Sequence, residues 1–339
     1  MDLKTLHPQL PINAGEPRSV SVVVPSYNHA KFIERALRSI FAQTLQPRDL
    51  VVIDDGSKDE SVTIIKRVLE EAPFPAELIA HENRGLSTTL NEAMRRTADG
   101  SPARFFAYLG SDDVWLPDFL EKRIELLEQR PNAVLAYGNA YSIDADDRVI
   151  NCSIDWATYT DGDARRMLLE GTAPLSPTVV YRRVAIEDLR WNENSRLEDY
   201  EFYLRLSVKG EFAFDPEILS AWRQHGANTS EGSMMMMEEK ISALERTAPL
   251  FDLSDADLNA LIRLARFRGA QELMRRCHKK AAMKFGLPNL TAAKSITEIA
   301  RFIGGLLTPT STLQDRQRHT RAAMNKKYDA LALPTTKST

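Results

Sequence analysis

Pairs of acidic side chains follow apolar runs along this 339-residue chain, and such pairs can bind a divalent cation. Four clusters could carry chemistry: Pro25-Ser26-Tyr27-Asn28, Asp54-Asp55, Asp112-Asp113 and Glu198-Asp199. The first three follow short apolar runs, whereas the fourth opens a helical pattern. Ligands of an open α/β sheet bind beyond the carboxyl ends of its strands, so we expect the first three clusters to share one crevice. Carboxylates there suit a divalent metal and a phosphate-bearing ligand.

Two common phosphate-binding motifs are missing from the sequence. It contains neither the G-x-G-x-x-G fingerprint of dinucleotide-binding proteins nor the G-x-x-x-x-G-K-[ST] loop of ATPases. Any phosphate must therefore be held in another way, and a metal bound by carboxylates is the obvious substitute.

The elements that must position these clusters alternate between strand and helix in the first half of the chain. Short β-branched or apolar runs predict strands, and apolar residues at helical spacing predict the helices between them. The expected strands are 19–24, 50–53, 77–80 and 104–109, and the intervening helices include 31–43 and one that ends near Glu71. This alternation predicts a mainly parallel sheet with helices on both faces.

The regular alternation of strand and helix ends after this half, and the chain as a whole divides into four parts. Further strands are expected at 133–137, 178–181, 211–214 and 218–222, with a helix at 199–208. Helical patterns then dominate at 235–248, 255–285 and about 294–306. We therefore expect a flexible arm over 1–18, an α/β domain over 19–230, a helical region over 231–313 and a polar, partly disordered tail over 314–339.

Charge is unevenly distributed along the chain. The segment from Ser233 onward contains 18 Lys and Arg and 10 Asp and Glu, a net charge of +8. Residues 1–232 contain 26 Lys and Arg and 37 Asp and Glu, a net charge of −11. The acidic front half argues against nucleic acid as a ligand. The basic rear half suggests an anionic surface such as membrane headgroups.

Cysteine use and hydropathy indicate the compartment. Cys152 and Cys277 form neither a disulfide framework nor a zinc motif, which fits a reducing cytoplasm. Residues 1–18 have no apolar signal core, and no run approaches the roughly 18 apolar residues of a membrane-spanning helix. We therefore expect a cytoplasmic protein, at the inner face of the cell membrane if the basic region binds lipid.

Taken together, the motifs resemble those of a family of enzymes. Residues 20 to about 230 resemble a family 2 glycosyltransferase with the GT-A fold, a Rossmann-like α/β fold with a mainly parallel sheet; the helices beyond it would be an extension. The motifs that carry the resemblance, in order, are Val24-Pro25-Ser26-Tyr27-Asn28, Ile53-Asp54-Asp55-Gly56-Ser57-Lys58-Asp59, Asn83-Arg84-Gly85-Leu86-Ser87, Leu109-Gly110-Ser111-Asp112-Asp113, Glu198-Asp199-Tyr200 and Arg223-Gln224-His225. Each motif is weak alone, but six in this order are specific.

The resemblance implies that the first three motifs bind a nucleotide-sugar donor. Pro25, Tyr27 and Asn28 would line its base and ribose. Of Asp54 and Asp55, one would accept a hydrogen bond from a uracil-like N–H and the other would cap the following turn. This preference for uracil makes a UDP-linked donor the expected one.

The resemblance also implies roles along the donor's diphosphate. Asn83 and Gly85 would let the backbone approach ribose or diphosphate, because glycine has no side chain; a plain turn is the alternative for Gly85. Asp113 and His225 would bind Mn²⁺ or Mg²⁺, with Asp112 nearer the ribose. Gly110 occupies the first Asp position of the family's D-x-D motif.

The resemblance makes Asp199 the general base of an inverting transfer, beside Glu198 at the donor. A carboxylate can take the acceptor hydroxyl's proton while that oxygen attacks the anomeric carbon. The structural alternative is that Glu198 and Asp199 only favour a helix N-terminus through its dipole. The acceptor would be a hydroxyl of a glycan or a lipid-linked sugar, as in bacterial polysaccharide biosynthesis.

Other interpretations of the motifs remain. A nucleotidyltransferase also pairs an α/β sheet with metal-binding carboxylates, but usually carries a Gly-rich basic loop after its first strand. A phosphoacceptor receiver domain would not explain Glu198-Asp199 or His225. A catalytically inactive, nucleotide-sugar-binding relative is the third alternative.

The basic rear half has two open interpretations. Within 263–284 apolar residues interleave with the bases Arg263, Arg266, Arg268, Arg275, Arg276, Lys279, Lys280 and Lys284. Such a pattern suits peripheral contact with an anionic leaflet. Equally, these helices could pack on the α/β domain or form a homo-oligomer, with the bases as a solvated face.

Overall fold

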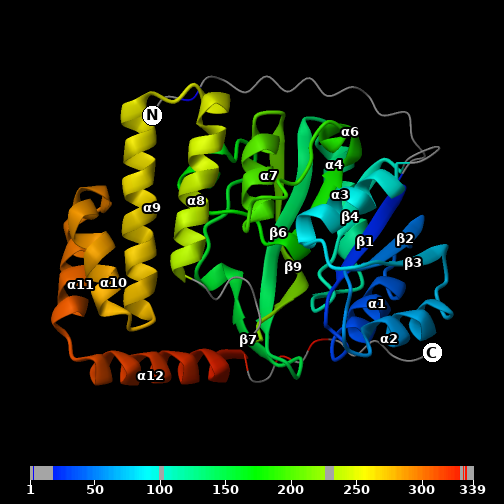
Figure 1. The fold of residues 1–339 in the computed structure, drawn as a ribbon, viewed down its shortest axis with the longest axis horizontal. Coiled ribbons are helices and arrows are strands. Elements are labelled where there is room, and N and C mark those ends of the chain that lie inside the picture. Colours follow the sequence, from blue (N-terminus) through cyan, green and yellow to red (C-terminus); the bar gives the residue numbers. More distant parts are fainter. Residues whose placement is uncertain are drawn as a thin grey trace.

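A mixed nine-stranded sheet forms the centre of the molecule (Figure 1). The computed structural model describes residues 18–98, 103–225 and 233–328, together with residues 3, 331 and 333. The strand order is β3-β2-β1-β4-β8-β6-β9-β5, and β7 pairs with β6. Strands β1 to β4 run parallel, β8 is antiparallel to both β4 and β6, and β6 and β9 are parallel to one another.

The strands differ in length, and β6 and β9 are the longest, with 11 and 13 residues. Their bounds are β1 Val20–Ser26, β2 Asp49–Asp54, β3 Ala76–Ala80, β4 Phe105–Tyr108, β5 Val114–Trp115, β6 Ala133–Ile143, β7 Val149–Cys152, β8 Val180–Arg182 and β9 Glu211–Arg223.

Helices cover both faces of the sheet and then continue as a separate layer (Figure 1). The helices are α1 Ile33–Phe41, α2 Ser61–Leu69, α3 Leu86–Arg96, α4 Phe119–Gln129, α5 Arg165–Leu169, α6 Arg183–Ile186, α7 Glu198–Ser207, α8 Ser233–Thr247, α9 Asp255–Arg275, α10 Lys279–Gly286, α11 Ile296–Leu307 and α12 Thr310–Tyr328.

The side-chain alternation of β1 explains why helices lie on both faces. Successive residues of a strand point to opposite sides of the sheet. Val22 and Val24 pack in the cluster that includes Ile33 and Leu37 of α1. Val23 instead packs in the cluster that includes Leu90 of α3. Because both faces are buried, the centre of β1 is the continuous apolar run Val22-Val23-Val24, as expected for a central parallel strand.

The C-terminal helices pack on α7 and on one another. Helix α8 contacts α7, α9 contacts α8, and α10 and α11 contact α9. A small core of their own, including Phe267, Met274 and Phe302, holds α9, α10 and α11 together. These helices therefore extend the fold beside the sheet, as the sequence predicts.

Three elements differ from the sequence prediction. The two strands expected at 211–214 and 218–222 form one strand, β9, whose pairing with β6 continues past Pro216 through register shifts. The single helix expected at 255–285 is interrupted between α9 and α10, where Cys277 has φ 62°. The expected polar tail begins inside α12, which contacts β7 and whose Tyr328 is buried beside Tyr141.

The fold class is the expected one, a mainly parallel α/β sheet flanked by helices with a helical extension. Within the described residues, the structure has no helix with the length and hydropathy needed to span a bilayer. Most of the expected arm over 1–18 lies outside the described residues.

Candidate functional site

A cavity of about 1560 Å³ opens at the carboxyl ends of β1, β2 and β4, which is where the sequence predicts it. It extends past the start of α7 to the C-terminal helices. The expected site residues that line it are Pro25, Tyr27, Asn28, Asp55, Asn83, Gly85, Asp112, Asp113, Glu198, Asp199 and His225. Segments from both halves of the chain therefore contribute to one site. Of the expected site residues, only Asp54 does not line the cavity.

Asp54 lies behind the cavity wall and shapes the turn after β2. Its carboxylate accepts hydrogen bonds from the Ser57 amide at 2.8 Å, the Ser57 hydroxyl at 2.6 Å and the Ser26 hydroxyl at 3.1 Å. The side chain is buried, so these donors satisfy it within the protein. Of the two roles expected for the Asp54-Asp55 pair, Asp54 therefore takes the turn cap, and it does not line the cavity in which a donor would bind.

Asp55 faces the cavity and fixes the loop before α3. Its two carboxylate oxygens accept from the backbone amides of Arg84 at 2.7 Å and Gly85 at 2.9 Å. Each oxygen keeps a further lone pair that can accept from a ligand. Gly85 has φ 90° and no atom within 4 Å of where a Cβ would lie. Glycine is therefore required there by the backbone angle rather than by crowding.

The turn after β1 is tied to the turn after β2. The Asn28 side-chain oxygen accepts from the Lys58 amide at 2.7 Å, and the Asn28 amide donates to the Ser57 hydroxyl at 2.8 Å. Asn28 has φ 53°, a conformation that asparagine tolerates better than most residues. This turn presents the Tyr27 ring, 46% exposed, at the cavity wall, where a flat ligand could stack on it.

Three side chains bring metal-ligand atoms together on one wall of the cavity. His29, Asp112 and His225 each offer one ligand atom, and these atoms all lie within 4.8 Å of one another. His225 Nε2 lies 2.9 Å from Asp112 Oδ2, and His29 Nδ1 lies 3.9 Å from Asp112 Oδ1. Burial lowers the pKa of His29, although the Asp112 charge raises it, so the neutral imidazole that binds metals is favoured. The group is chemically suited to a divalent cation.

His29 belongs to the metal-ligand group, although no sequence motif assigns it a role. It directly follows Asn28, and its ring faces the His225 ring at 5.3 Å between centroids and 90° between planes. Its Nδ1 also lies 2.7 Å from the Ser111 hydroxyl. Its place after the β1 motif was the available signal, but the sequence does not reveal that His225 would lie opposite.

The structure groups Asp112 with His225, whereas Asp113 is the metal ligand that the resemblance implies. Asp113 is buried, and its Oδ1 accepts from the Arg223 amide at 2.9 Å, which ties the end of β9 to the loop after β4. Burial, together with the Asp112 charge, raises the pKa of Asp113. A Cβ at Gly110 would lie 2.9 Å from Asp113 and 3.0 Å from Asp112, which explains the glycine at that position.

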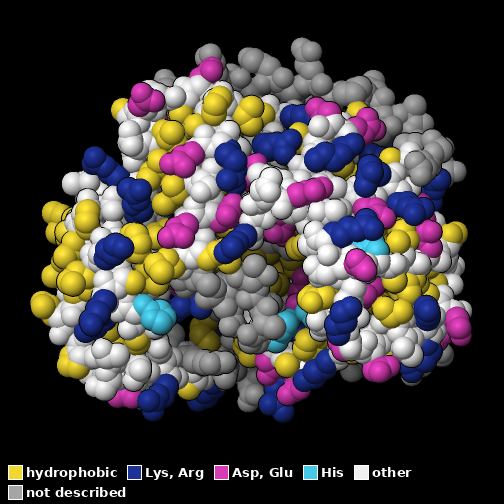
Figure 2. All heavy atoms as spheres, in the orientation of Figure 1, with side chains coloured by type: hydrophobic (Ala, Val, Ile, Leu, Met, Phe, Trp, Pro, Cys, Tyr) yellow, Lys and Arg dark blue, Asp and Glu magenta, His cyan; other side chains and the backbone are white. Residues whose placement is uncertain are grey.

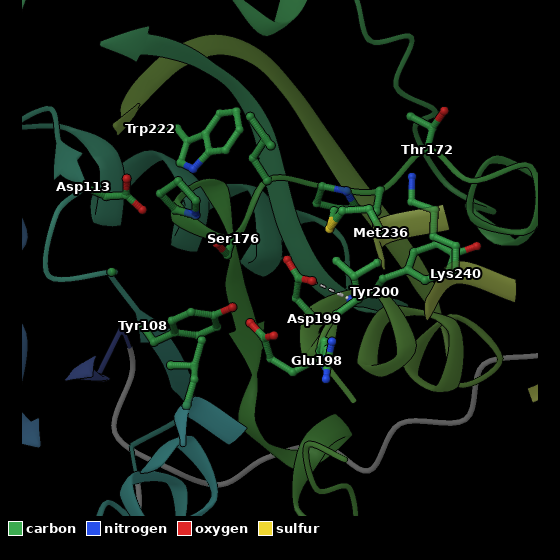
Figure 3. Close-up of a pocket in the computed structure, with 18 of the residues that line it drawn as sticks. Tyr108, Asp113, Thr172, Ser176, Glu198, Asp199, Tyr200, Trp222, Met236 and Lys240 are labelled. Carbon is green, nitrogen blue, oxygen red and sulfur yellow. Dashed lines mark hydrogen bonds between the residues drawn. The ribbon is translucent and has the colours of Figure 1, made fainter. Parts of the chain in front are cut away.

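Glu198 and Asp199 begin α7 at the middle of the cavity (Figure 3). Burial raises the pKa of both carboxyl groups, and the Asp199 charge raises that of Glu198 further. Asp199 is partly stabilised as the anion, because its Oδ1 accepts from the Tyr200 amide at 2.7 Å and Lys240 lowers its pKa. The pair therefore favours a neutral Glu198 beside an ionised Asp199, an arrangement that supplies one base.

Three tryptophans near the site have different environments. Trp222 lines the cavity and lies near Asp113 in Figure 3. Trp191 is buried in the core and stacks on Phe202 at 4.3 Å between centroids. Trp156, which the sequence analysis does not single out, is 50% exposed and also lines the cavity.

Comparison with known proteins gives one family and several distant relatives. Residues 21–190 match the family described as glycosyl transferase family 2. An uncharacterized glycosyltransferase of Rickettsia prowazekii is 25% identical over 233 residues, covering 65% of this chain and 68% of the relative. Chondroitin synthase of Escherichia coli is 26% identical over 221 residues, covering 65% of this chain and 31% of that protein.

Solved structures resemble the fold over nearly the whole chain. A mannosyltransferase from Pyrobaculum calidifontis, in complex with GDP-Man and Mn²⁺, has a TM-score of 0.59 at 18% identity, covering 97% of this chain and 92% of that chain. S. aureus TarS 1–349, in complex with UDP-GlcNAc, has a TM-score of 0.59 at 16% identity, covering 92% and 91%. At these identities the likeness shows the fold alone.

Proposed function

The chain belongs to glycosyl transferase family 2, and we propose that it transfers a sugar from a nucleotide diphosphate sugar to an acceptor hydroxyl with inversion at the anomeric carbon. One observation carries the proposal. A single cavity is lined by Asp55, by the His29–Asp112–His225 group and by the Glu198-Asp199 pair at the start of α7. Nucleotide recognition, diphosphate neutralisation and proton removal would thus occur in one cavity.

In this proposal Asp199 is the general base. Its carboxylate takes the proton of the acceptor hydroxyl while the hydroxyl oxygen attacks the anomeric carbon from the face opposite the leaving diphosphate. Glu198 keeps its own proton at neutral pH and can donate a hydrogen bond to the donor sugar. Both side chains are half-buried at the cavity wall, where bound donor and acceptor would displace the water that could compete with the acceptor.

We propose Mn²⁺ rather than Mg²⁺ as the preferred cofactor. Mg²⁺ favours an all-oxygen octahedral set, whereas His29 and His225 supply nitrogen, which transition metals accept more readily. The ion would supply positive charge that neutralises the leaving diphosphate. The Pyrobaculum mannosyltransferase is in complex with GDP-Man and S. aureus TarS with UDP-GlcNAc, so either nucleotide occurs among proteins of this fold.

UDP is the proposed nucleotide, and hexosyl or N-acetylhexosaminyl transfer is the proposed class. Asp55 faces the cavity with lone pairs that can accept from the uracil N–H, next to the Tyr27 ring. A glycan or lipid-linked acceptor in polysaccharide biosynthesis is the proposed partner. The catalytic unit would comprise residues 19–230, with the helices of 231–313 completing the cavity. The family match leaves the nucleotidyltransferase alternative without support.

A donor screen tests this function directly. Purified protein, Mn²⁺ and a panel of nucleotide sugars are assayed for released nucleotide diphosphate, with Asp199→Asn as the inactive control. UDP with Mn²⁺ should also stabilise the protein by about 2.7 kcal/mol at a hundredfold excess over its dissociation constant. Stabilisation by GDP but not by UDP would contradict the nucleotide assignment. Release from none of the panel, with or without added glycan, would contradict the transferase itself.

We also propose that the surface of α10 and α11 makes peripheral contact with a membrane. Figure 2 shows hydrophobic side chains gathered along the left edge of the molecule, over α10 and α11. Ile296 is 86% exposed and Leu307 is 81% exposed. Exposed bases, among them Lys280 and Lys284, flank this surface. Apolar side chains bordered by bases suit an anionic interface. Arg268, in contrast, turns into the cavity and is not available to lipid.

A further inference from the structure

Four cations gather at the end of the cavity that is remote from the nucleotide motifs. Arg166 comes from α5, Lys240 from α8, Arg268 from α9, and Lys294 from the segment before α11; these four are called the basic cluster. All four line the cavity. They are up to 128 positions apart in the chain, so the fold itself brings the charges together.

One carboxylate lies among these four charges. Glu170 accepts from Lys294 at 2.7 Å and from Arg166 at 3.2 Å, and Arg268 lies 3.4 Å from it. Lys240 is not among these partners of the Glu170 carboxylate and instead donates to the Gly171 carbonyl at 3.0 Å. Asp163, the other acidic residue lining this end, is engaged by Arg165 at 2.7 Å. Positive charge therefore exceeds negative charge here.

The excess of positive charge is electrostatically unfavourable, and a bound anionic ligand would offset it. Burial lowers the pKa of Lys240, and the nearby Arg268 charge lowers it further. Lys240 and Arg268 are only partly exposed, so water screens their mutual repulsion weakly, and this is unfavourable unless a counter-charge is present. Arginine and lysine side chains that line a cavity readily bind carboxylate or phosphate oxygens.

The position of the basic cluster connects it with the acceptor. In the view of Figure 3, Asp199 lies between Asp113 and Trp222 on one side and Lys240 and Thr172 on the other. The metal-ligand group and the nucleotide motifs lie at the Asp113 side. A donor that occupies that side leaves the Lys240 side of Asp199 for the molecule that provides the hydroxyl.

We infer that the acceptor carries an anionic oxyanion group, a carboxylate or a phosphate, that binds the basic cluster while the reacting hydroxyl lies at Asp199. The inference rests on the proposed glycosyl transfer, since it assumes which side of Asp199 the donor occupies. It narrows the acceptor class to acidic glycans or phosphate-linked sugars. Neutral acceptors would lack the contact that positions the hydroxyl.

Calorimetric titration of the full-length protein, first saturated with UDP and Mn²⁺, tests the inference. Three oligomers of matched length are compared: a neutral N-acetylhexosamine oligomer, a uronate-containing oligomer and a glycerol phosphate oligomer. At least one anionic oligomer should bind about tenfold or more tightly than the neutral one, as a charge-assisted hydrogen bond predicts. Preference for the uronate oligomer assigns a carboxylate, and preference for glycerol phosphate assigns a phosphate.

Paired substitutions locate the binding. Arg166→Gln with Lys294→Gln should weaken binding of the preferred anionic oligomer by about tenfold or more. The side chains are 78% and 59% exposed, so the fold should survive, and melting temperature checks this. The matched control is Arg263→Gln with Arg266→Gln, exposed residues of α9 outside the cavity lining, and it should leave the affinity unchanged.

Three results would overturn the inference: equal binding of neutral and anionic oligomers, binding of none of them, or full anionic binding by the Arg166 and Lys294 variant. Failure of the proposed function is a separate observation. If no nucleotide binds with Mn²⁺, transfer is excluded, while the anion preference can still be measured on the nucleotide-free protein.

Discussion

His225 Nε2 lies 2.9 Å from Asp112 Oδ2, across a separation of 113 positions in the sequence. This contact joins the end of β9 to the loop after β4, and His29 from the turn after β1 completes the group. A candidate metal site thus depends on three segments that meet only in the folded protein. The nearby bond from the Arg223 amide to Asp113 fixes the end of β9 that carries His225.

Substitution of His29 tests whether it is a metal ligand. His29→Ala should raise the Mn²⁺ concentration needed for half-maximal donor binding by at least ~10- to 100-fold. Loss of even an outer-shell partner of a metal site has an effect of that size. Calorimetry with Mn²⁺ and UDP measures this. His319→Ala, an exposed substitution on α12, is the control. Asp112→Asn should be as damaging, and unaltered Mn²⁺ affinity in both variants would remove this group as the metal site.

The two carboxyl groups of α7 should respond differently to amide substitution. Asp199→Asn should leave UDP binding near normal and reduce turnover by about 10²- to 10⁴-fold, the usual contribution of a positioned base. Glu198→Gln should cost less, because burial and the Asp199 charge already favour its neutral form, which an amide resembles. Steady-state kinetics and UDP titration separate the two effects. Turnover of Asp199→Asn equal to wild type would exclude its role as base.

The pH dependence of turnover should reflect the raised pKa of Asp199. Activity needs the ionised carboxylate, so it is lost as pH falls through that pKa, and the acid limb should lie above the ordinary aspartate value of about 3.9. Lys240 lowers the pKa of Asp199, so Lys240→Gln should raise that pKa and move the acid limb to higher pH. Lys240→Arg keeps the charge and should not move it. A limb that is identical in both variants would contradict this coupling.

Membrane contact through the surface of α10 and α11 can be tested by sedimentation with anionic vesicles. The intact protein should bind at low salt and be released as salt rises, because basic residues contribute about 1 kcal/mol each near an anionic leaflet. Ile296→Asp with Leu307→Asp should abolish binding, whereas Leu250→Asp, at an exposed site away from that surface, should not. Absence of vesicle binding, with a dimer by light scattering, would favour the alternative of a homo-oligomer.

The sequence is sufficient to predict the parts of the fold that depend on local pattern. The valines of β1 and the apolar stripe of α1 predict a buried strand followed by a covering helix, and both are present. The sequence pattern is less informative where tertiary contacts determine the secondary structure. Pairing with β6 keeps β9 continuous through Pro216, and the contact with β7 orders a helix from a polar tail.

The candidate site also has features that the sequence predicts and features that depend on tertiary contacts. The clusters after β1, β2 and β4 meet because parallel strands end at one edge, which the sequence predicts. Which aspartate of each pair faces the cavity depends on neighbouring donors: Ser26 and Ser57 hold Asp54 inward, and the Arg223 amide holds Asp113. Of the basic cluster, the sequence groups only Arg268 with the bases of 263–284, and a helical pattern does not reveal that Arg268 faces the cavity.

The residues that line the cavity are spread along the chain, so a ribosome would synthesise the parts of the site one after another. The nucleotide motifs emerge first, and the segment matched by the family ends at residue 190, before Asp199 and His225 have been made. The metal-ligand group cannot close until residue 225 has emerged, and the wall that carries Lys240, Arg268 and Lys294 comes later still. A nascent or prematurely terminated chain could therefore present a nucleotide pocket while lacking the groups that act on the acceptor.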